Sequence, residues 1–245
     1  MKPQHTIIYI VLVSASTCAQ QASAPHVAAQ VGPKASVRSL PGLAVPAGSS
    51  AVAELDRPWD DAFGVVLLQS RQRMVLHSCR DFIRLPLDGF DAENEGEWNA
   101  LWNVGARCVA LDWVASAQPA KVSFLIREQT SATFLKALPP FMALALSGDE
   151  ARSVNNAVGR CEEWGTYDPK LEIADGSGGR LTIRGDGWDG AITEYARGDF
   201  NLDGYEDVLL RRDASPTGGS LFVTSLYAIT RLGPGECFRV VRRLR

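Results

Sequence analysis

Residues 198–210 read Gly-Asp-Phe-Asn-Leu-Asp-Gly-Tyr-Glu-Asp-Val-Leu-Leu. Oxygen-bearing side chains alternate at Asp199, Asn201 and Asp203, and the glycine that follows lets the chain turn sharply. Asp207 closes the loop and leads into an apolar, β-prone run, which predicts a strand. The stretch therefore predicts a tight loop that enters a β-strand and presents oxygen ligands to a hard cation such as Ca²⁺.

The expected calcium ligands are four side chains and one main-chain carbonyl: Asp199, Asn201, Asp203, Asp207 and the carbonyl of Tyr205. An EF-hand also requires Glu at position twelve of its loop, and that position here is Leu210. The loop followed by a strand resembles the FG-GAP or VCBS-type repeats of secreted bacterial proteins, over roughly residues 196–230. In those families the matching positions bind Ca²⁺. A propeller needs several such blades, and the single clear copy argues against one.

Residues 1–24 predict an export signal. Lys2 precedes an apolar stretch at 7–13 that is too short to cross a bilayer, and small residues follow it. Two kinds of processing fit: ordinary signal-peptidase cleavage, or acylation of Cys18 after a lipobox-like sequence, which would tether the protein to a membrane. Residues 25–55 are rich in Ala, Ser, Gly and Pro without periodicity, which predicts a flexible linker.

The cysteine count supports export. The chain has five cysteines: Cys18, Cys79, Cys108, Cys161 and Cys237. If Cys18 leaves with the signal or carries lipid, four remain, and an exported chain is expected to pair them in one of three ways. We expect Cys79–Cys108 and Cys161–Cys237, one bridge in each half. The second would close a long loop around the calcium motif and contribute roughly 4 kcal/mol in the chain-entropy model.

Residues 56–158 predict a mixed region with a helical bias. Acidic residues followed by apolar residues at three- and four-residue steps predict a helix from 91 to about 116. The apolar spacing of 63–85 suits either a helix or two strands. We further expect a strand at 122–126, and short helices near Pro139-Pro140 and from Gly148 to Val158.

Residues 159–245 predict β-structure. Leu171–Ile173 and Arg180–Ile183 flank a Gly-rich turn, and further strands are expected at 191–197, 207–212, 220–230 and 237–243. Short Gly-rich connections between neighbouring strands indicate an antiparallel meander. The predicted fold class is therefore α+β, with a helix-biased N-terminal half and a β-meander C-terminal half that carries the calcium loop.

The remaining residues favour a binding protein over an enzyme. His77 is the only histidine after the linker, no nucleophile elbow is present, and a net charge of −3 argues against a nucleic-acid partner. We expect an exported, non-catalytic calcium-binding protein in the periplasm, on the outer membrane or in the medium. It is expected to bind or inhibit an envelope or extracellular protein or glycan. Exposed aromatic residues such as Trp59, Trp164 and Trp188 would form the binding surface. The alternatives are a calcium-stabilised hydrolase of peptidoglycan or polysaccharide, with two carboxylates or His77 in a cleft, and a structural envelope lipoprotein.

Overall fold

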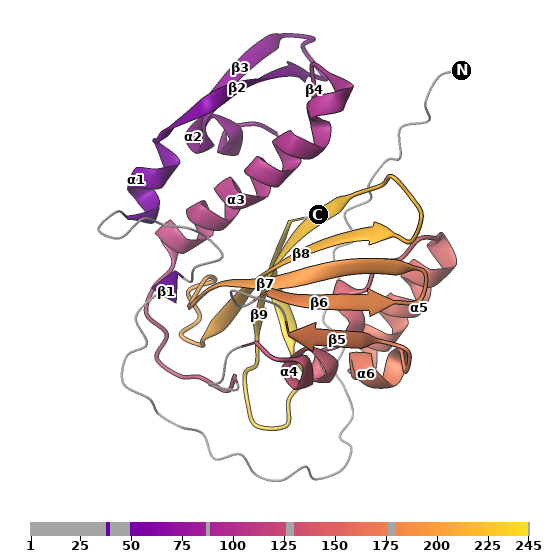
Figure 1. The fold of residues 1–245 in the computed structure, drawn as a ribbon. Coiled ribbons are helices and arrows are strands. Elements are labelled where there is room, and N and C mark those ends of the chain that lie inside the picture. Colours follow the sequence, from indigo (N-terminus) through magenta and orange to yellow (C-terminus); the bar gives the residue numbers. More distant parts are fainter. Residues whose placement is uncertain (1–37, 40–49, 87–88, 126–129, 176–179, 245) are drawn as a thin grey trace.

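The computed structural model describes residues 38–39, 50–86, 89–125, 130–175 and 180–244. Within them the chain has the expected α+β architecture, with an antiparallel meander in its C-terminal half (Figure 1). The expected signal at 1–24, the lipidation candidate Cys18 and the turn at 176–179 lie outside the described residues.

The N-terminal unit packs a long helix beneath a small sheet. Its elements are α1 (Ala51–Leu55), β2 (Pro58–Leu67), β3 (Arg73–Ser78), α2 (Cys79–Ile83), β4 (Phe90–Ala92), the short 3-10 helix η2 (Glu95–Glu97) and α3 (Trp98–Ser116). The strands pair antiparallel in the order β3-β2-β4. The region 63–85, which suits a helix or two strands by its spacing, thus forms two strands and then a short helix.

The C-terminal sheet is a meander in the order β10-β9-β8-β7-β6-β5. Its strands are β5 (Glu172–Asp175), β6 (Arg180–Gly185), β7 (Trp188–Gly198), β8 (Asp207–Pro216), β9 (Val223–Thr230) and β10 (Arg239–Leu244). All their pairings are antiparallel, and the two-residue strand β1 (Arg38–Ser39) adds to β7. Gly-rich turns between apolar runs produce this order because they favour pairing of consecutive strands.

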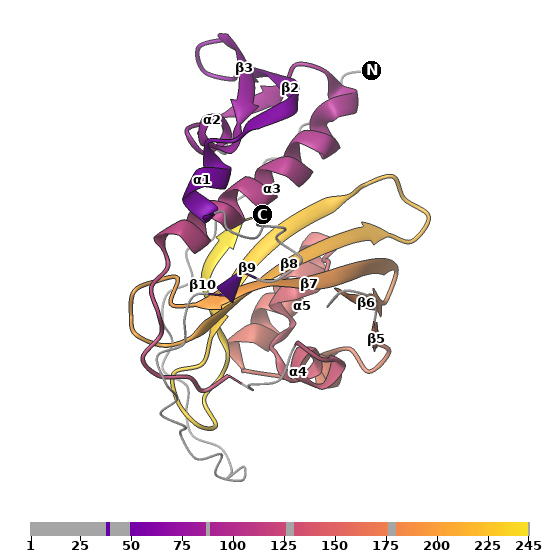
Figure 2. The ribbon, with the colours of Figure 1, turned by 60° about the vertical axis from the view of Figure 1, so that its left-hand side comes forward.

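Both faces of the sheet are covered, so the central strand β8 is buried on both sides. Leu209 faces the N-terminal unit, whereas Val208 and Leu210 face the opposite side, as the two-residue period of a strand requires. That opposite side is covered by α4 (Ala132–Ala137), the 3-10 helix η3 (Pro140–Met142), α5 (Gly148–Gly159) and α6 (Trp164–Tyr167). Figures 1 and 2 show α3 and these helices on opposite faces of the sheet.

Several sequence expectations are wrong in detail. The helix expected from 91 begins at Trp98, because residues 90–92 pair with β2 as β4. No strand forms over the described part of 122–126, where Val122 makes one isolated bridge to Tyr205. Within the expected linker 25–55, Ser50 caps α1 through a hydrogen bond from Ala53 N to its hydroxyl, and residues 38–39 pair with β7.

None of the described helices combines the length and apolar character needed to cross a membrane.

Candidate metal centre

The loop that is predicted to bind calcium, residues 199–207 and called the calcium loop after that prediction, connects β7 to β8 in the large sheet. Two of its residues adopt left-handed backbone conformations, Leu202 with φ 66° and Gly204 with φ 90°. This conformation is ordinary for glycine and uncommon for leucine, so the loop is held in a specific tight turn. The turn leaves Asn201 and Asp203 exposed, whereas Asp199 and Asp207 lie buried at the base of the loop.

Side-chain oxygens of the predicted ligands shape the loop by accepting backbone hydrogen bonds. Asp199 accepts from the N–H groups of Asp203 (3.1 Å) and Gly204 (2.7 Å), one through each carboxylate oxygen. Asp203 in turn accepts from Tyr205 N at 2.8 Å and from the Asn201 amide at 2.8 Å. Each carboxylate oxygen has two lone pairs, so an N–H partner still leaves a lone pair for a cation.

Asp207 differs from the other ligand candidates because part of its carboxylate has no hydrogen-bond partner. Its side chain is fully buried, and Oδ2 accepts from Phe200 N at 2.8 Å. Oδ1 is buried and accepts no hydrogen bond here: the Thr230 hydroxyl lies close enough to lower the pKa of the Asp207 carboxyl, but it donates to the Glu206 carbonyl at 3.1 Å. A buried carboxylate oxygen without a partner is costly, which makes this atom the candidate ligand that most needs a partner.

The electrostatics of the loop agree with this description. Burial, with a smaller contribution from the negative charges of Asp203 and Asp199, raises the pKa of the Asp207 carboxyl to about 7, against the lowering effect of the Phe200 N–H and the nearby Thr230 hydroxyl. Among the described residues, none of these three carboxylates takes part in an ion pair. The loop thus concentrates negative charge, and no described cationic side chain lies within ion-pair distance of these three carboxylates, although Lys121 lies beside Gly204.

The fifth predicted ligand, the Tyr205 carbonyl, is on the same side of the chain as the carboxylates. Tyr205 forms a parallel bridge with Val122, in which the neighbouring Gly204 carbonyl and Glu206 N–H make the hydrogen bonds. Tyr205 N points the other way, to Asp203. Because N–H and C=O of one residue in extended chain point to the same side, the Tyr205 carbonyl faces Asp203.

The structure thus brings all five predicted ligands into one loop, but it does not arrange them as a complete coordination sphere. Among the described residues, no group of three or more His, Cys, Asp or Glu side chains has the geometry of a metal site. The Asp199 and Asp203 oxygens are oriented by backbone N–H groups instead. Binding of a hard cation would require side-chain rotations that bring these oxygens together with Oδ1 of Asp207.

The cysteines form the two expected pairs. Cys79 and Cys108 link α2 to α3, with Cα atoms 4.8 Å apart, and Cys161 and Cys237 are linked with Cα atoms 5.7 Å apart. The second bridge spans 76 residues and encloses the calcium loop in the sequence.

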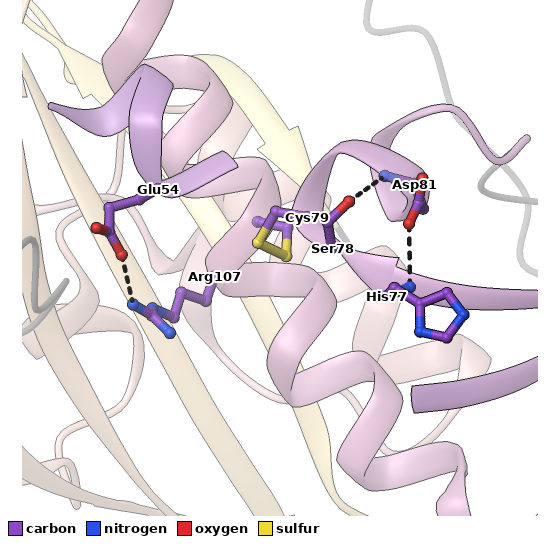
Figure 3. Close-up of a disulfide and its surroundings, with 7 residues drawn as sticks. Glu54, His77, Ser78, Cys79, Asp81 and Arg107 are labelled. Atoms are coloured by element: carbon purple, nitrogen blue, oxygen red, sulfur yellow. Dashed lines mark hydrogen bonds and ion pairs between the residues drawn. A yellow bond between two sulfur atoms is a disulfide. The ribbon is translucent and has the colours of Figure 1, made fainter. Parts of the chain in front are cut away.

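His77 lies beside the first bridge but forms no catalytic arrangement in the described residues. Its backbone N–H donates to Asp81 at 3.0 Å, which helps to keep the pKa of that carboxyl below its ordinary value. Figure 3 shows the imidazole pointing away from the Cys79 disulfide, and the side chain is exposed. The hydrogen bond to Asp81 thus orders the backbone before α2 and leaves the ring free.

The aromatic residues expected on a binding surface are mostly inside the protein. Trp164 is fully buried and Trp188 is 3 % exposed, with their rings stacked at 6.2 Å, while Trp59 is partly buried against Phe63. The expectation for Trp164 and Trp188 is therefore wrong, because both fill the core between the sheet and its covering helices.

Two shallow hollows of about 380 and 540 Å³ occur on the described surface. The first is lined by Glu172 and Asp189, but Arg184 lies between these carboxylates, at 3.5 and 2.8 Å. The second, beside α4, contains a single carboxylate, Glu163. Neither hollow contains His77, so neither combines the groups that the hydrolase alternative calls for.

Sequence reasoning missed the partners of the loop outside it. Ser123 donates to Glu206 at 2.6 Å across 83 residues, and Phe124 packs against Tyr205 with ring centroids 6.0 Å apart. No short-range pattern signals such contacts. The apolar stretch at 122–126 is the one local hint, and its pattern predicts a strand instead.

No protein-family model matches this chain, and neither a curated protein nor a solved structure shows significant similarity to it.

Proposed function

We propose that this chain is an exported, non-catalytic calcium-binding protein whose ion is structural. The proposed ligands are those predicted from the sequence: Asp199, Asn201, Asp203, Asp207 and the carbonyl of Tyr205. One observation carries the proposal, namely the fully buried Oδ1 of Asp207, which has no hydrogen-bond partner. A divalent cation supplies the missing partner and offsets the charge of three neighbouring carboxylates.

The arrangement of the loop supports Ca²⁺ over softer metals. The proposed ligands are all oxygens, and Asn201 and Asp203 are exposed, so an ion can enter from solvent. The backbone hydrogen bonds to Asp199 hold the loop in shape, which reduces the ordering that binding requires. We expect an affinity in the extracellular range, roughly 10⁻⁴ to 10⁻³ M.

Export is supported by the N-terminal sequence and by the disulfides. Residues 1–24 have the composition of a signal, and the pairs Cys79–Cys108 and Cys161–Cys237 require an oxidising compartment. We therefore propose that the protein resides in the periplasm, on the outer membrane through lipidated Cys18, or in the medium. The resemblance of the loop to FG-GAP or VCBS-type repeats is consistent with each of these locations.

We further propose that the protein binds or inhibits an envelope or extracellular protein or glycan. The shallow hollows and the free ring of His77 support this over the hydrolase alternative, which calls for paired carboxylates or His77 in a cleft. A structural envelope lipoprotein is the remaining alternative, and it would self-associate, which sedimentation measurements detect. Capture of partners from an envelope extract, with calcium and with EDTA, tests the binding role.

The calcium proposal is tested by thermal melting of the purified protein in calcium and in EDTA. The wild type should melt at a higher temperature in calcium, because an ion that binds only the folded state stabilises it. Asp203→Ala should abolish the difference, whereas Asp149→Ala, which changes an exposed carboxylate on α5, should preserve it. Equal melting temperatures of the wild type in the two solutions would refute calcium binding at the loop.

A further inference from the structure

A segment outside the helices and strands lies along the calcium loop. This segment, residues 118–125 and hereafter the connector, leads from the end of α3 towards α4. At its start, Gln118 and Asp199 exchange two backbone hydrogen bonds, of 3.0 and 2.9 Å. The residue that opens the proposed ligand set therefore also holds the connector through its main chain.

The middle of the connector is attached to the far end of the loop. The N–H groups of Lys121 and Val122 both donate to the Gly204 carbonyl, at 2.8 and 3.1 Å, and Glu206 N donates to the Val122 carbonyl at 2.8 Å. The Ser123 hydroxyl donates to the Glu206 carboxylate at 2.6 Å. All these loop groups belong to residues between or beside proposed ligands, so the connector contacts depend on the conformation of the loop.

Helix α3 is attached to the sheet in a different way. Arg211 donates to the Asn103 side chain of α3 at 2.6 Å and pairs with Asp213 at 2.8 Å. Leu101 and Leu111 of α3 share an apolar cluster with the sheet. These contacts lie outside the calcium loop, so a change in the loop should release the connector without releasing α3.

Without a cation, the carboxylates of Asp199, Asp203 and Asp207, which lie within nine residues of one another in one loop, repel one another. The loop can relieve this repulsion by opening, because Asn201 and Asp203 are already exposed. Opening moves the Gly204 carbonyl and the Asp199 main chain, to which the connector is bonded. Loss of the ion therefore weakens the connector contacts.

We propose that calcium bound at the loop holds the connector in place, and that loss of calcium exposes the peptide bond after Lys121 to proteases. The inference rests on the proposed calcium site. The Lys121 side chain is already exposed, so the barrier to cleavage is the bonded main chain on either side of it. Calcium concentration would then set the lifetime of the exported protein.

The test is limited digestion of the full chain with a lysine-specific protease that does not itself need calcium, with mass spectrometry of the products. Cleavage after Lys121 should be about 5- to 150-fold faster in EDTA than in calcium, the range over which a typical coupling between two sites changes local opening. Cleavage after Lys136, which is exposed on α4, should not change and serves as the internal reference. Equal rates at Lys121 in the two solutions overturn the inference.

Calorimetric titration with calcium separates this inference from the proposed function. Calcium binding without protection of Lys121 refutes the role of the connector and leaves the calcium site standing. Absence of calcium binding refutes both. Protection of Lys121 in a wild type that also binds calcium supports both.

A pair of serine variants tests the contact directly. Ser123→Ala removes the hydroxyl bonded to Glu206 and leaves every proposed ligand intact, so cleavage after Lys121 in calcium should rise about three- to tenfold. Ser116→Ala is the matched control, because its hydroxyl donates to Trp113 at the end of α3 and not to the loop. Equal cleavage rates in the two variants would contradict the proposed link between connector and loop.

Discussion

Asp207→Asn should have opposite effects on stability in the absence and in the presence of calcium. The substitution keeps the shape of a fully buried side chain and its acceptor for the Phe200 N–H, but it removes the charge. In EDTA the buried, charged carboxylate destabilises the folded state, so its replacement by a neutral amide should stabilise the protein. In calcium the same carboxylate is a ligand, so its removal should abolish the gain from the ion.

The expected stabilisation in EDTA follows from the pKa of Asp207, which burial raises from 3.8 to about 7. The unfolded chain loses this proton near pH 4 and the folded protein near pH 7, so the penalty grows between these values and is complete above pH 7. A pKa that is higher by roughly three in the folded protein than in the unfolded chain destabilises the folded state by at most about 4 kcal/mol. A weaker hydrogen bond to Phe200 N offsets about 1 kcal/mol, which leaves a net stabilisation of about 1–3 kcal/mol.

The gain of the wild type in calcium follows from its expected affinity. An ion at about 10 mM, with a dissociation constant of roughly 10⁻⁴ to 10⁻³ M, stabilises the folded state by about 1.4–2.7 kcal/mol. For a folded part of this size, that gain raises Tm by roughly 3–10 °C. Asp207→Asn should show no such rise.

Urea denaturation and thermal melting at pH 8, in EDTA and in calcium, measure both effects. Asp60→Asn, which neutralises an exposed carboxylate on β2, is the matched control and should behave like the wild type in both solutions. The reasoning is refuted if Asp207→Asn is less stable than the wild type in EDTA, or if the variant retains the full response to calcium.

Other buried charges lead to two further predictions. Burial alone would raise the pKa of the Glu194 carboxyl. The hydrogen bond and the positive charge of Arg197, together with hydrogen bonds from Thr130, instead hold that pKa below its ordinary value. Glu194→Gln should therefore lower the free energy of unfolding by about 1–3 kcal/mol at pH 7. This difference from the wild type should shrink as the pH falls below about 4, because the wild-type carboxyl then takes up a proton. Urea denaturation at several pH values measures the difference. Arg211→Ala should cost about 3 kcal/mol because it leaves a buried carboxylate without its cation, whereas the exposed Arg184→Ala should cost under about 1 kcal/mol in the same assay.

Much of the β-structure follows from local sequence. Residues 180–183 and 207–212 alternate or concentrate β-prone apolar residues between turn signals, and each lies within a strand of the meander. Consecutive strands with short turns have few alternatives to antiparallel pairing. The sheet order is thus predictable because its contacts are close in the sequence.

The errors arise where a distant segment competes with a local preference. Residues 91–97 have the acidity of a helix start, but 90–92 pair with β2 and delay the helix to Trp98. The apolar residues at 122–125 look like a strand, yet only the backbone of Val122 is bonded to the 199–207 loop, in a single isolated bridge to Tyr205. The sequence suggests that Trp164 and Trp188 lie on the surface, but the helices that cover the sheet bury both side chains in the core.

The sequence by itself determined which oxygen-bearing residues are candidate ligands and how they are spaced, because alternation around a glycine is a property of nine consecutive residues. It also restricted the cysteine pairs to three connectivities. Only the tertiary structure decided that Asp207 is buried with one oxygen lacking a partner, and that the connector is bonded to the loop. The hydrogen bonds between connector and loop join segments some 80 residues apart in the sequence. These segments come together only when α3 and the sheet pack against each other.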